Sequence, residues 1–398
     1  MRTGITHLYI PGPTNVPERV RQAMNVPMQD MRAHDYGELT KPLFDGVKRV
    51  FKQERGRMFF FPGSATGAWE AAITNTLNPG DKVLMGRFGQ FSMLWVEMAT
   101  KLGLEVEVVD APWGEALPVQ EMARRLEADR AGRIKAVFVT HNETATGVTS
   151  PVPAVRDVLD ELDHSALLFV DGVSSIASID FRMDEWGVDL AVCGSQKGFM
   201  MPAGLAMLAV SDKAMAASET AKMRRAYFDF ADMVKFNDGG FFPYTPPTQL
   251  FHGLKASLDL IFEEGLEQVF ARHRRLAEGV RRGVRAWGLE TVARDLRFQS
   301  DTITAIRVPA DVDAREVIAI AYDKYRTSFG SGLGPLAGKA FRIGHLGDLN
   351  EVMCLSALAS AEMALKEAGC PIQLGAGVGA AQGWFQDTGI APDLRAVA

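Results

Sequence analysis

The hydrophobic pattern of the first 250 residues alternates between two kinds of segment. Short apolar runs, typical of strands buried on both faces, occupy residues 134–140, 166–170, 189–194 and 205–210. Residues 152–163, between the first two runs, have apolar positions at helical spacing. Strands and helices that alternate in this way predict an open α/β fold with a mostly parallel sheet.

The pattern changes at the segment GGFFPYTPPTQ, residues 239–249, which is dense in glycine, proline and aromatic residues and predicts a loop or linker. Beyond it, apolar residues from Phe251 to Phe270 recur every three or four positions and predict one long amphipathic helix. A strand-like segment at 302–308 follows, then a helix from about residue 313 and another at 350–368.

These changes divide the chain into three predicted parts. We expect an N-terminal arm over residues 1–20, a large α/β domain over 21–250 and a smaller C-terminal α+β domain over 251–398. A chain of 398 residues is long enough to bury a large core in each of the two domains.

Composition excludes several classes of protein. The chain has 43 Lys and Arg against 49 Asp and Glu, a net charge of −6, and 47% of its residues are hydrophobic. This balance is typical of a globular protein and not of a disordered one. Mild acidity without a basic block argues against nucleic acid as a partner. No apolar run reaches the length of a membrane span, so we expect no membrane partner either.

The cysteine pattern predicts a cytoplasmic protein without a metal site. Cys193, Cys354 and Cys370 are scattered and form no CxxC pair, which favours reduced thiols. The N-terminal residues are too polar, and too soon interrupted by proline, for a signal peptide. His141 and Glu143 lack an HExxH motif and a third ligand, so they do not predict a metal centre.

Two polar residues that follow consecutive predicted strands are the first candidates for chemistry. Asp171 ends the run ALLFV, and Lys197 follows the run DLAVCG. Taken singly, Asp171 is explained as a turn cap and Lys197 as a solvated loop lysine. The carboxyl ends of parallel strands share one edge of a sheet, where ligands bind, so the two side chains can face one crevice.

This pair fits the needs of pyridoxal 5′-phosphate. The cofactor's aldehyde forms a Schiff base with a lysine, and its ring nitrogen pairs with a carboxylate. A phosphate group also needs a cradle, and Ser64, Ala65 and Thr66 precede a predicted helix start. The backbone N–H groups at a helix N-terminus bind phosphate, although ordinary capping also explains a serine or threonine there.

Longer motifs carry a resemblance to a known family. They span nearly the whole chain: PGPTNVPE (11–18), GAWEAAITNTLNPGD (67–81), HNETATGV (141–148), LLFVDGVSSIASIDFRMDEWGVDLAVCGSQKG (167–198), PYTPP (243–247), IFEEGLEQVFARHRRL (261–276) and GKAFRIGHLG (338–347). On these motifs the chain resembles the class V aminotransferases of pyridoxal-phosphate fold type I, specifically the serine–glyoxylate aminotransferases. The resemblance implies a large, mostly parallel sheet of seven strands and a smaller C-terminal α+β domain.

The resemblance also implies a role for each matching residue. Lys197 and Asp171 would be catalytic, as the Schiff-base lysine and the partner of the ring nitrogen. The remaining implied cofactor contacts are Ser64, Ala65 and Thr66 with Gln196 at the phosphate, Phe91 stacked on the ring, Thr144 beside it, and Thr245 reaching the neighbouring subunit's cofactor. Arg342 would bind the substrate carboxylate. Because Thr245 would act across the interface, the family pattern implies a homodimer with shared active sites.

Two positions leave questions open. Ala65 stands where relatives commonly have glycine, and the extra methyl group puts the exact backbone contacts of the phosphate loop in doubt. Arg87 lies close in sequence to Phe91, and whether it faces the pocket is open. A spare cation there would favour a dicarboxylate substrate.

The expected reaction transfers the amino group of L-serine to glyoxylate and yields hydroxypyruvate and glycine. L-aspartate is the alternative donor and L-alanine the third. A cysteine desulfurase or lyase is the next mechanism, but Cys354 lies in a helical pattern rather than a mobile loop. From other classes, a nicotinamide-dependent dehydrogenase lacks a placed phosphate fingerprint, and a noncatalytic binding protein does not explain Lys197 and Asp171 together.

Two further motifs predict ordinary structure. GAGVGA, residues 375–380, loosely fits a dinucleotide fingerprint but has no strand–helix–strand unit around it, so it predicts a loop. The arginine-rich stretch 272–285 predicts the solvated face of an amphipathic helix.

Overall fold

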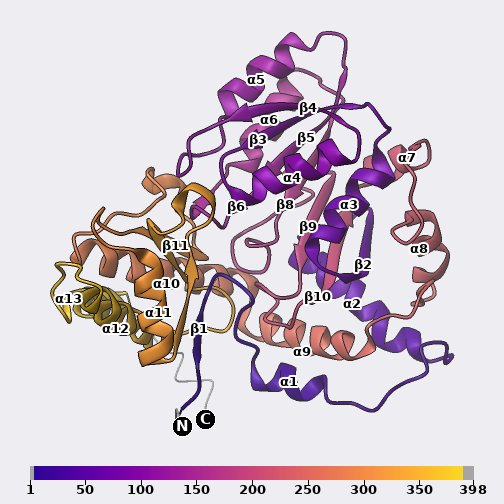
Figure 1. Ribbon diagram of the computed structural model, residues 1–398. Helices are drawn as coiled ribbons and strands as arrows, with labels where there is room; N and C mark the ends of the chain where they lie inside the picture. Colours follow the sequence, from indigo (N-terminus) through magenta and orange to yellow (C-terminus); the bar gives the residue numbers. More distant parts are fainter. Residues whose placement is uncertain (1–3, 389–398) are drawn as a thin grey trace.

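The computed structural model describes residues 4–388 and contains two main sheets (Figure 1). The large sheet has seven strands in the order β2-β10-β9-β8-β5-β3-β4. β10 runs antiparallel to both its neighbours, and every other neighbouring pair is parallel. Its strands are β2 (Arg57–Gly63), β3 (Lys82–Arg87), β4 (Glu105–Asp110), β5 (Ile134–Thr140), β8 (Leu167–Asp171), β9 (Leu190–Gly194) and β10 (Gly204–Val210). The predicted mostly parallel sheet is confirmed.

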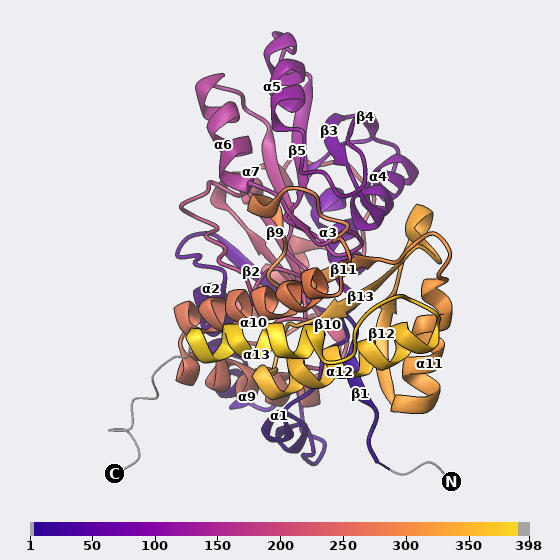
Figure 2. The same ribbon diagram turned by 90° about the vertical axis from the view of Figure 1, so that its left-hand side faces the viewer.

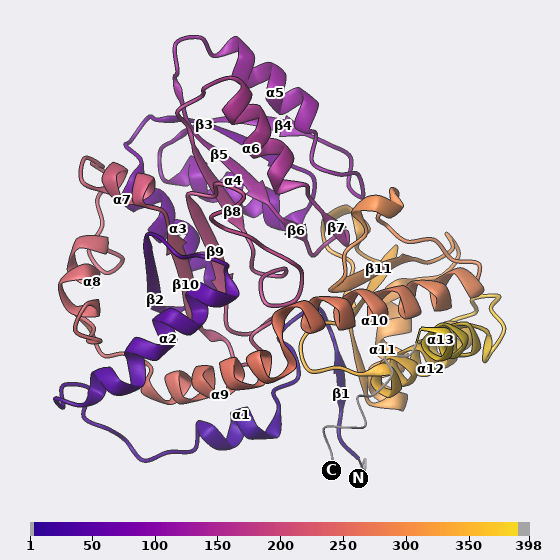
Figure 3. The same ribbon diagram turned by 180° about the vertical axis from the view of Figure 1, so that it is seen from behind.

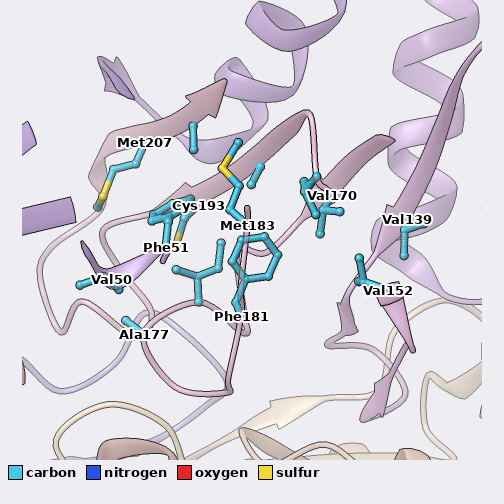
Figure 4. Close-up of a cluster of buried hydrophobic side chains, with 14 of the residues drawn as sticks. Val50, Phe51, Val139, Val152, Val170, Ala177, Phe181, Met183, Cys193 and Met207 are labelled. Atoms are coloured by element: carbon cyan, nitrogen blue, oxygen red, sulfur yellow. The ribbon is translucent and has the colours of Figure 1, made fainter. Parts of the chain in front are cut away.

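Helices cover both faces of the large sheet. One face carries α3 (Ala65–Thr76), α4 (Gln90–Lys101), α7 (Asp212–Ser218) and α8 (Phe230–Asn237). The other carries α1 (Glu18–Ala23), α2 (Tyr36–Val50), α5 (Val119–Ala128), α6 (Val152–Glu161) and α9 (Thr248–Glu264). Because strand side chains alternate between faces, Leu168 and Val170 of β8 join the second core and Leu167 and Phe169 the first. Figure 4 shows part of the second core, with Val139, Val170 and Cys193 from three strands.

The smaller sheet has the order β1-β12-β13-β11 and joins the N-terminal segment to the C-terminal part of the chain. It consists of β1 (His7–Tyr9), β11 (Ile303–Arg307), β12 (Thr327–Ser331) and β13 (Ala340–Gly344), and β1 pairs in parallel with β12. Its helices are α10 (Leu266–Ala286), α11 (Ala314–Tyr325), α12 (Glu351–Glu367) and α13 (Ala376–Asp387). Figure 2 shows α10, α13 and α12 side by side over this sheet. The short strands β6 (Asn142–Glu143) and β7 (Val148–Thr149) form a separate hairpin.

Three predictions about the C-terminal half are wrong. The expected single helix over 251–270 is broken at Gly265, whose φ of 88° suits glycine, and the chain continues as α10 in a new direction (Figure 3). GAGVGA is not a loop, because residues 376–380 begin α13, which packs on α10. The arginine stretch is only partly solvated, since Arg281 is buried and donates to the Ser300 carbonyl.

The predicted domain division at residue 250 stays a prediction, and its outer bounds, residues 1 and 398, lie outside the described residues. The apolar side chains of α9, including Phe251 and Leu258, belong to the core of the large sheet. Those of α10, including Leu276 and Val284, belong to the core of the smaller sheet. Among residues 4–388, no helix combines the length and the apolar character needed to cross a membrane.

Candidate active site

All the predicted site residues except Thr245 and Arg342 lie where the parallel strands of the large sheet end. β2, β3, β5, β8 and β9 run in one direction, so the residues that follow them lie at one edge of the sheet. Ser64 to Thr66 follow β2, Phe91 follows β3, Thr144 follows β5, Asp171 ends β8, and Gln196 and Lys197 follow β9. Open α/β sheets bind ligands at this edge.

Lys197 is a buried amine held by the N-terminal segment of the chain. Its Nζ donates a hydrogen bond to the Pro11 carbonyl. A Cβ atom on Gly12 would lie 2.5–2.8 Å from Lys197 Cδ, Cε and Nζ, so only glycine allows this approach. Thr14 Oγ1 donates to the Lys197 carbonyl at 3.1 Å. Burial lowers the pKa of Lys197 to about 8, with a smaller contribution from Arg342, so neutral pH leaves part of the amine uncharged.

Asp171 is a buried carboxyl group with one oxygen to spare. Oδ1 accepts from the Val173 backbone N–H at 2.9 Å, and Oδ2 has no hydrogen-bond donor among the described residues. Burial, with a smaller contribution from the nearby Glu143 carboxylate, raises the pKa of Asp171 to about 7. The indole N–H of Trp69 also lies close enough to the carboxyl group to lower this pKa, but it makes no well-formed hydrogen bond. Such a carboxylate suits a cationic N–H donor.

The N-terminus of α3 offers free donors. Ser64 is the N-cap residue, but its side chain makes no capping hydrogen bond. The backbone N–H groups of Ala65 and Thr66 belong to the first turn and therefore have no acceptor inside the helix. A Cβ on Gly194 would lie 2.7 Å from Gln196 Oε1 and 3.2 Å from the Ala65 methyl, so Gln196 lies beside this turn. Free donors at the positive end of a helix favour a phosphate.

Arg342 is a buried guanidinium without a carboxylate partner among residues 4–388. It lies on β13 with 7% of its surface exposed. Its Nε donates to the Ser331 carbonyl at 2.8 Å and its Nη1 to the Thr144 carbonyl at 3.0 Å, which leaves the Nη2 hydrogens free. Burial lowers the pKa of Arg342 to about 10, so it stays charged at neutral pH. A buried, unpaired cation needs an anion, and its planar fork fits a carboxylate.

The remaining predicted residues differ in how the structure places them. Phe91 is the second residue of α4, and its ring is partly buried. Thr144 Oγ1 donates to Ser174 Oγ at 2.8 Å in the loop that follows Asp171. Thr245 is exposed, and no hydrogen bond joins it to the other predicted residues within the described chain. Arg87 donates from Nε and Nη2 to both carboxylate oxygens of Asp110, at 2.6 and 2.9 Å, so it is not a spare cation.

Sequence reasoning gave no role to several residues that the structure places at the site. Pro11, Gly12 and Thr14 contact Lys197, and a glycine between two prolines is the signal that could have drawn attention to them. For Glu143, the sequence suggests only a metal ligand, and the missing HExxH motif argues against that role. Its hydrogen bonds to Phe91 and Ser92 join residues that are 52 and 51 positions apart in the sequence.

These groups match pyridoxal 5′-phosphate part by part. A buried amine suits its aldehyde, a buried carboxylate with a free oxygen suits its ring nitrogen, and the free donors of α3 suit its phosphate. The fold and the site together define a pyridoxal-phosphate enzyme of fold type I.

A family model for class V aminotransferases matches residues 7–324, and this chain belongs to that family, whose cofactor is pyridoxal 5′-phosphate. The chain is 58% identical to the serine–glyoxylate aminotransferase of Hyphomicrobium methylovorum, over 95% of this chain and 94% of that protein. It is 52% identical to the L-aspartate–glyoxylate aminotransferase of Paracoccus denitrificans, over 98% of each. The solved ureidoglycine–glyoxylate aminotransferase of Bacillus subtilis has a TM-score of 0.89 at 25% identity and covers 97% of this chain and 99% of its own.

Membership of this family leaves the dehydrogenase and the noncatalytic binding protein without support. The desulfurase alternative loses its nucleophile, because Cys193, Cys354 and Cys370 are all buried. Burial raises the pKa of the Cys354 thiol to about 12, far from the value of a reactive thiolate.

Proposed function

We propose that this aminotransferase transfers the amino group of L-serine to glyoxylate and releases hydroxypyruvate and glycine. The observation that carries the proposal is Arg342, a buried guanidinium with two fixed hydrogen bonds, free Nη2 hydrogens and no carboxylate partner in the described chain. Both substrates carry a carboxylate that this group can bind.

The site residues then have distinct tasks. When bound, pyridoxal 5′-phosphate supplies a ring that accepts electrons from the substrate Cα. Lys197 Nζ would hold the cofactor aldehyde and, when free, move the proton at the substrate Cα, which a pKa of about 8 suits. Asp171 would keep a proton on the ring nitrogen, and Ser64, Ala65, Thr66 and Gln196 would hold the phosphate.

The surroundings of Arg87 favour serine over aspartate. An aspartate donor carries a second carboxylate, which needs a second cation in a desolvated pocket. Arg87 is the cation that the sequence suggests for this role, but its Nε and Nη2 already donate to the carboxylate of Asp110. The relative with 58% identity bears a serine–glyoxylate name, and the one with 52% an aspartate–glyoxylate name. L-aspartate and then L-alanine are the alternative donors.

The test compares kcat/KM for L-serine, L-aspartate and L-alanine with glyoxylate as the acceptor, in the wild type and in Arg342→Lys. We expect serine to be preferred. We expect Arg342→Lys to lower kcat/KM for every donor and for glyoxylate, by a factor that corresponds to a loss of about 2–4 kcal/mol of transition-state stabilisation, since lysine loses the planar two-point contact. Arg87→Ala is the matched control and should leave the serine value unchanged. A preference for aspartate that Arg87→Ala abolishes would contradict the proposal.

We also propose a homodimer with shared sites, located in the cytoplasm. Tyr227 and Tyr244 stack at 4.9 Å between ring centroids, and both remain about 40% exposed beside Thr245. Aromatic rings exposed in this way are enriched at protein interfaces. All three cysteines are free thiols, which persist in a reducing compartment. Cell fractionation tests the location.

A further inference from the structure

Glu143 is a fully buried carboxylate that the reaction described above does not use. It lies in β6, just after β5 of the large sheet, with 0% of its surface exposed. Its Oε2 accepts from the backbone N–H of Phe91 at 3.1 Å, from that of Ser92 at 3.0 Å and from Ser92 Oγ at 3.1 Å. Its Oε1 accepts from the backbone N–H of Ala145 at 3.1 Å. Three of these four donors belong to the first turn of α4.

Glu143 therefore accepts the hydrogen bonds that an N-cap side chain usually accepts, although it lies in a strand distant in the sequence. The first N–H groups of a helix have no partner inside the helix, and the helix dipole favours a negative charge there. The N-cap residue of α4 is Gly89, which has no side chain to accept these hydrogen bonds. The first turn of α4 thus depends on Glu143 for its position.

The packing of Gly89 shows how closely the two residues fit. A Cβ atom on Gly89 would lie 2.2, 2.3 and 2.7 Å from Glu143 Cγ, Cδ and Oε2. The φ of Gly89 is −177°, an extended conformation that any residue adopts. Backbone freedom is therefore not what this position requires, and the Glu143 side chain leaves no room for a Cβ atom.

The same short segment contacts other parts of the site. The neighbouring Thr144 accepts a hydrogen bond from Arg342 through its carbonyl and donates one to Ser174 through its hydroxyl. Burial raises the pKa of Glu143, while its four donors favour the ionised form. The segment 143–144 thus connects the helix that bears Phe91 with the arginine expected to bind substrate.

We propose that Glu143 is a positioning residue that holds the first turn of α4, and with it the Phe91 ring, against the cofactor ring. This inference rests on the proposed function and on the contact of Phe91 with the cofactor ring that the family resemblance implies. A carboxylate that only stabilised the fold would support α4 without affecting how tightly or in which orientation the cofactor binds. The two possibilities differ in cofactor affinity, which can be measured without turnover.

The test measures the dissociation constant of pyridoxal 5′-phosphate from the apoenzyme by tryptophan fluorescence, together with the visible circular dichroism of the bound cofactor. We expect Glu143→Ala to weaken cofactor binding about ten-fold and to change the dichroism. A ten-fold loss is the size expected when the Phe91 ring moves and no longer stacks on the cofactor ring. Glu143→Gln keeps one acceptor oxygen and should therefore change the dissociation constant and the dichroism in the same direction but by less. If the alanine variant does not fold, the glutamine variant provides the test.

Asp189→Asn is the matched control. Asp189 is also buried and accepts from the Leu168 backbone N–H at 2.9 Å, but it lies at the opposite end of β9 from Lys197. This variant should lower the melting temperature and leave cofactor affinity and dichroism unchanged. If Glu143→Gln and Glu143→Ala also lower only the melting temperature and leave cofactor affinity and dichroism unchanged, the inference is overturned.

Gly89→Ala perturbs the same contact from the other side. It should weaken cofactor binding in the wild type, because the new Cβ displaces the Glu143 carboxylate, and add little in the Glu143→Ala background, where that side chain is gone. If Gly89→Ala weakens cofactor binding by the same factor in the wild type and in the Glu143→Ala background, the inference is overturned. Failure of the wild-type apoenzyme to bind pyridoxal 5′-phosphate would instead overturn the proposed function on which this inference rests. Failure of Phe91→Ala to weaken that binding would overturn the contact of Phe91 with the cofactor ring, and with it this inference.

Discussion

At the scale of single residues, the site contains charged groups whose burial changes their protonation. Lys197 has a pKa of about 8, below the ordinary 10.5 of lysine, because burial disfavours the ammonium form. The neutral amine is the form that bonds an aldehyde. The second-order rate of pyridoxal 5′-phosphate uptake by the apoenzyme should therefore rise with pH up to about 8 and level off above it.

Stopped-flow absorbance between pH 6 and 10.5 measures this profile, with Lys197→Ala as the control that forms no covalent bond. A rate that keeps rising to pH 10 would show an amine of ordinary basicity and contradict the burial described here.

At the scale of elements, the turn at Gly265 decides where α9 ends and α10 begins. Its φ of 88° and ψ of 135° lie in a region that only glycine occupies readily, and a Cβ there would also meet Gln268 Oε1 at 2.6 Å. Gly265→Ala should lower the free energy of unfolding by about 1–3 kcal/mol. Urea unfolding measures the change.

Gly383 in α13 provides the matched control for this substitution. It is exposed, and a Cβ there would meet no atom within 4 Å. Gly383→Ala should leave stability unchanged or raise it by up to about 1 kcal/mol, because alanine is the better helix former. Equal effects at the two glycines would argue against strain at residue 265.

At the scale of the whole molecule, the proposed shared site predicts complementation between inactive subunits. Lys197→Ala lacks the amine and Thr245→Arg would block the partner's phosphate site, so each homodimer should be inactive. A hybrid dimer has one site with both native residues. Random mixing should therefore restore about one quarter of wild-type activity.

Steady-state assays after mixing measure the recovery, and mass spectrometry of the intact dimers checks that subunits exchanged. Exchange without recovered activity would show that each subunit builds its site alone.

Local pattern was sufficient to predict most of the elements and part of the site. Apolar runs coincide with β5 (Ile134–Thr140) and, within a residue, with β8, β9 and β10. Because consecutive parallel strands end at the same edge, the positions of Asp171 and Lys197 after β8 and β9 already placed them together. The order of the strands, and thus which loops lie beside them, depends on pairing that no local pattern contains.

The alternation of strands and helices and the chemical groups at the strand ends follow from the sequence alone, because periodicity and side-chain chemistry are properties of neighbouring residues. Three contacts of the site arise only from tertiary packing. Pro11 and Gly12 lie against Lys197, Glu143 accepts hydrogen bonds from the first turn of α4, and Asp110 forms an ion pair with Arg87. Each of these contacts joins residues that are far apart in the chain. Their energies arise from burial and from hydrogen bonds that form only after the strands have paired and the helices have packed.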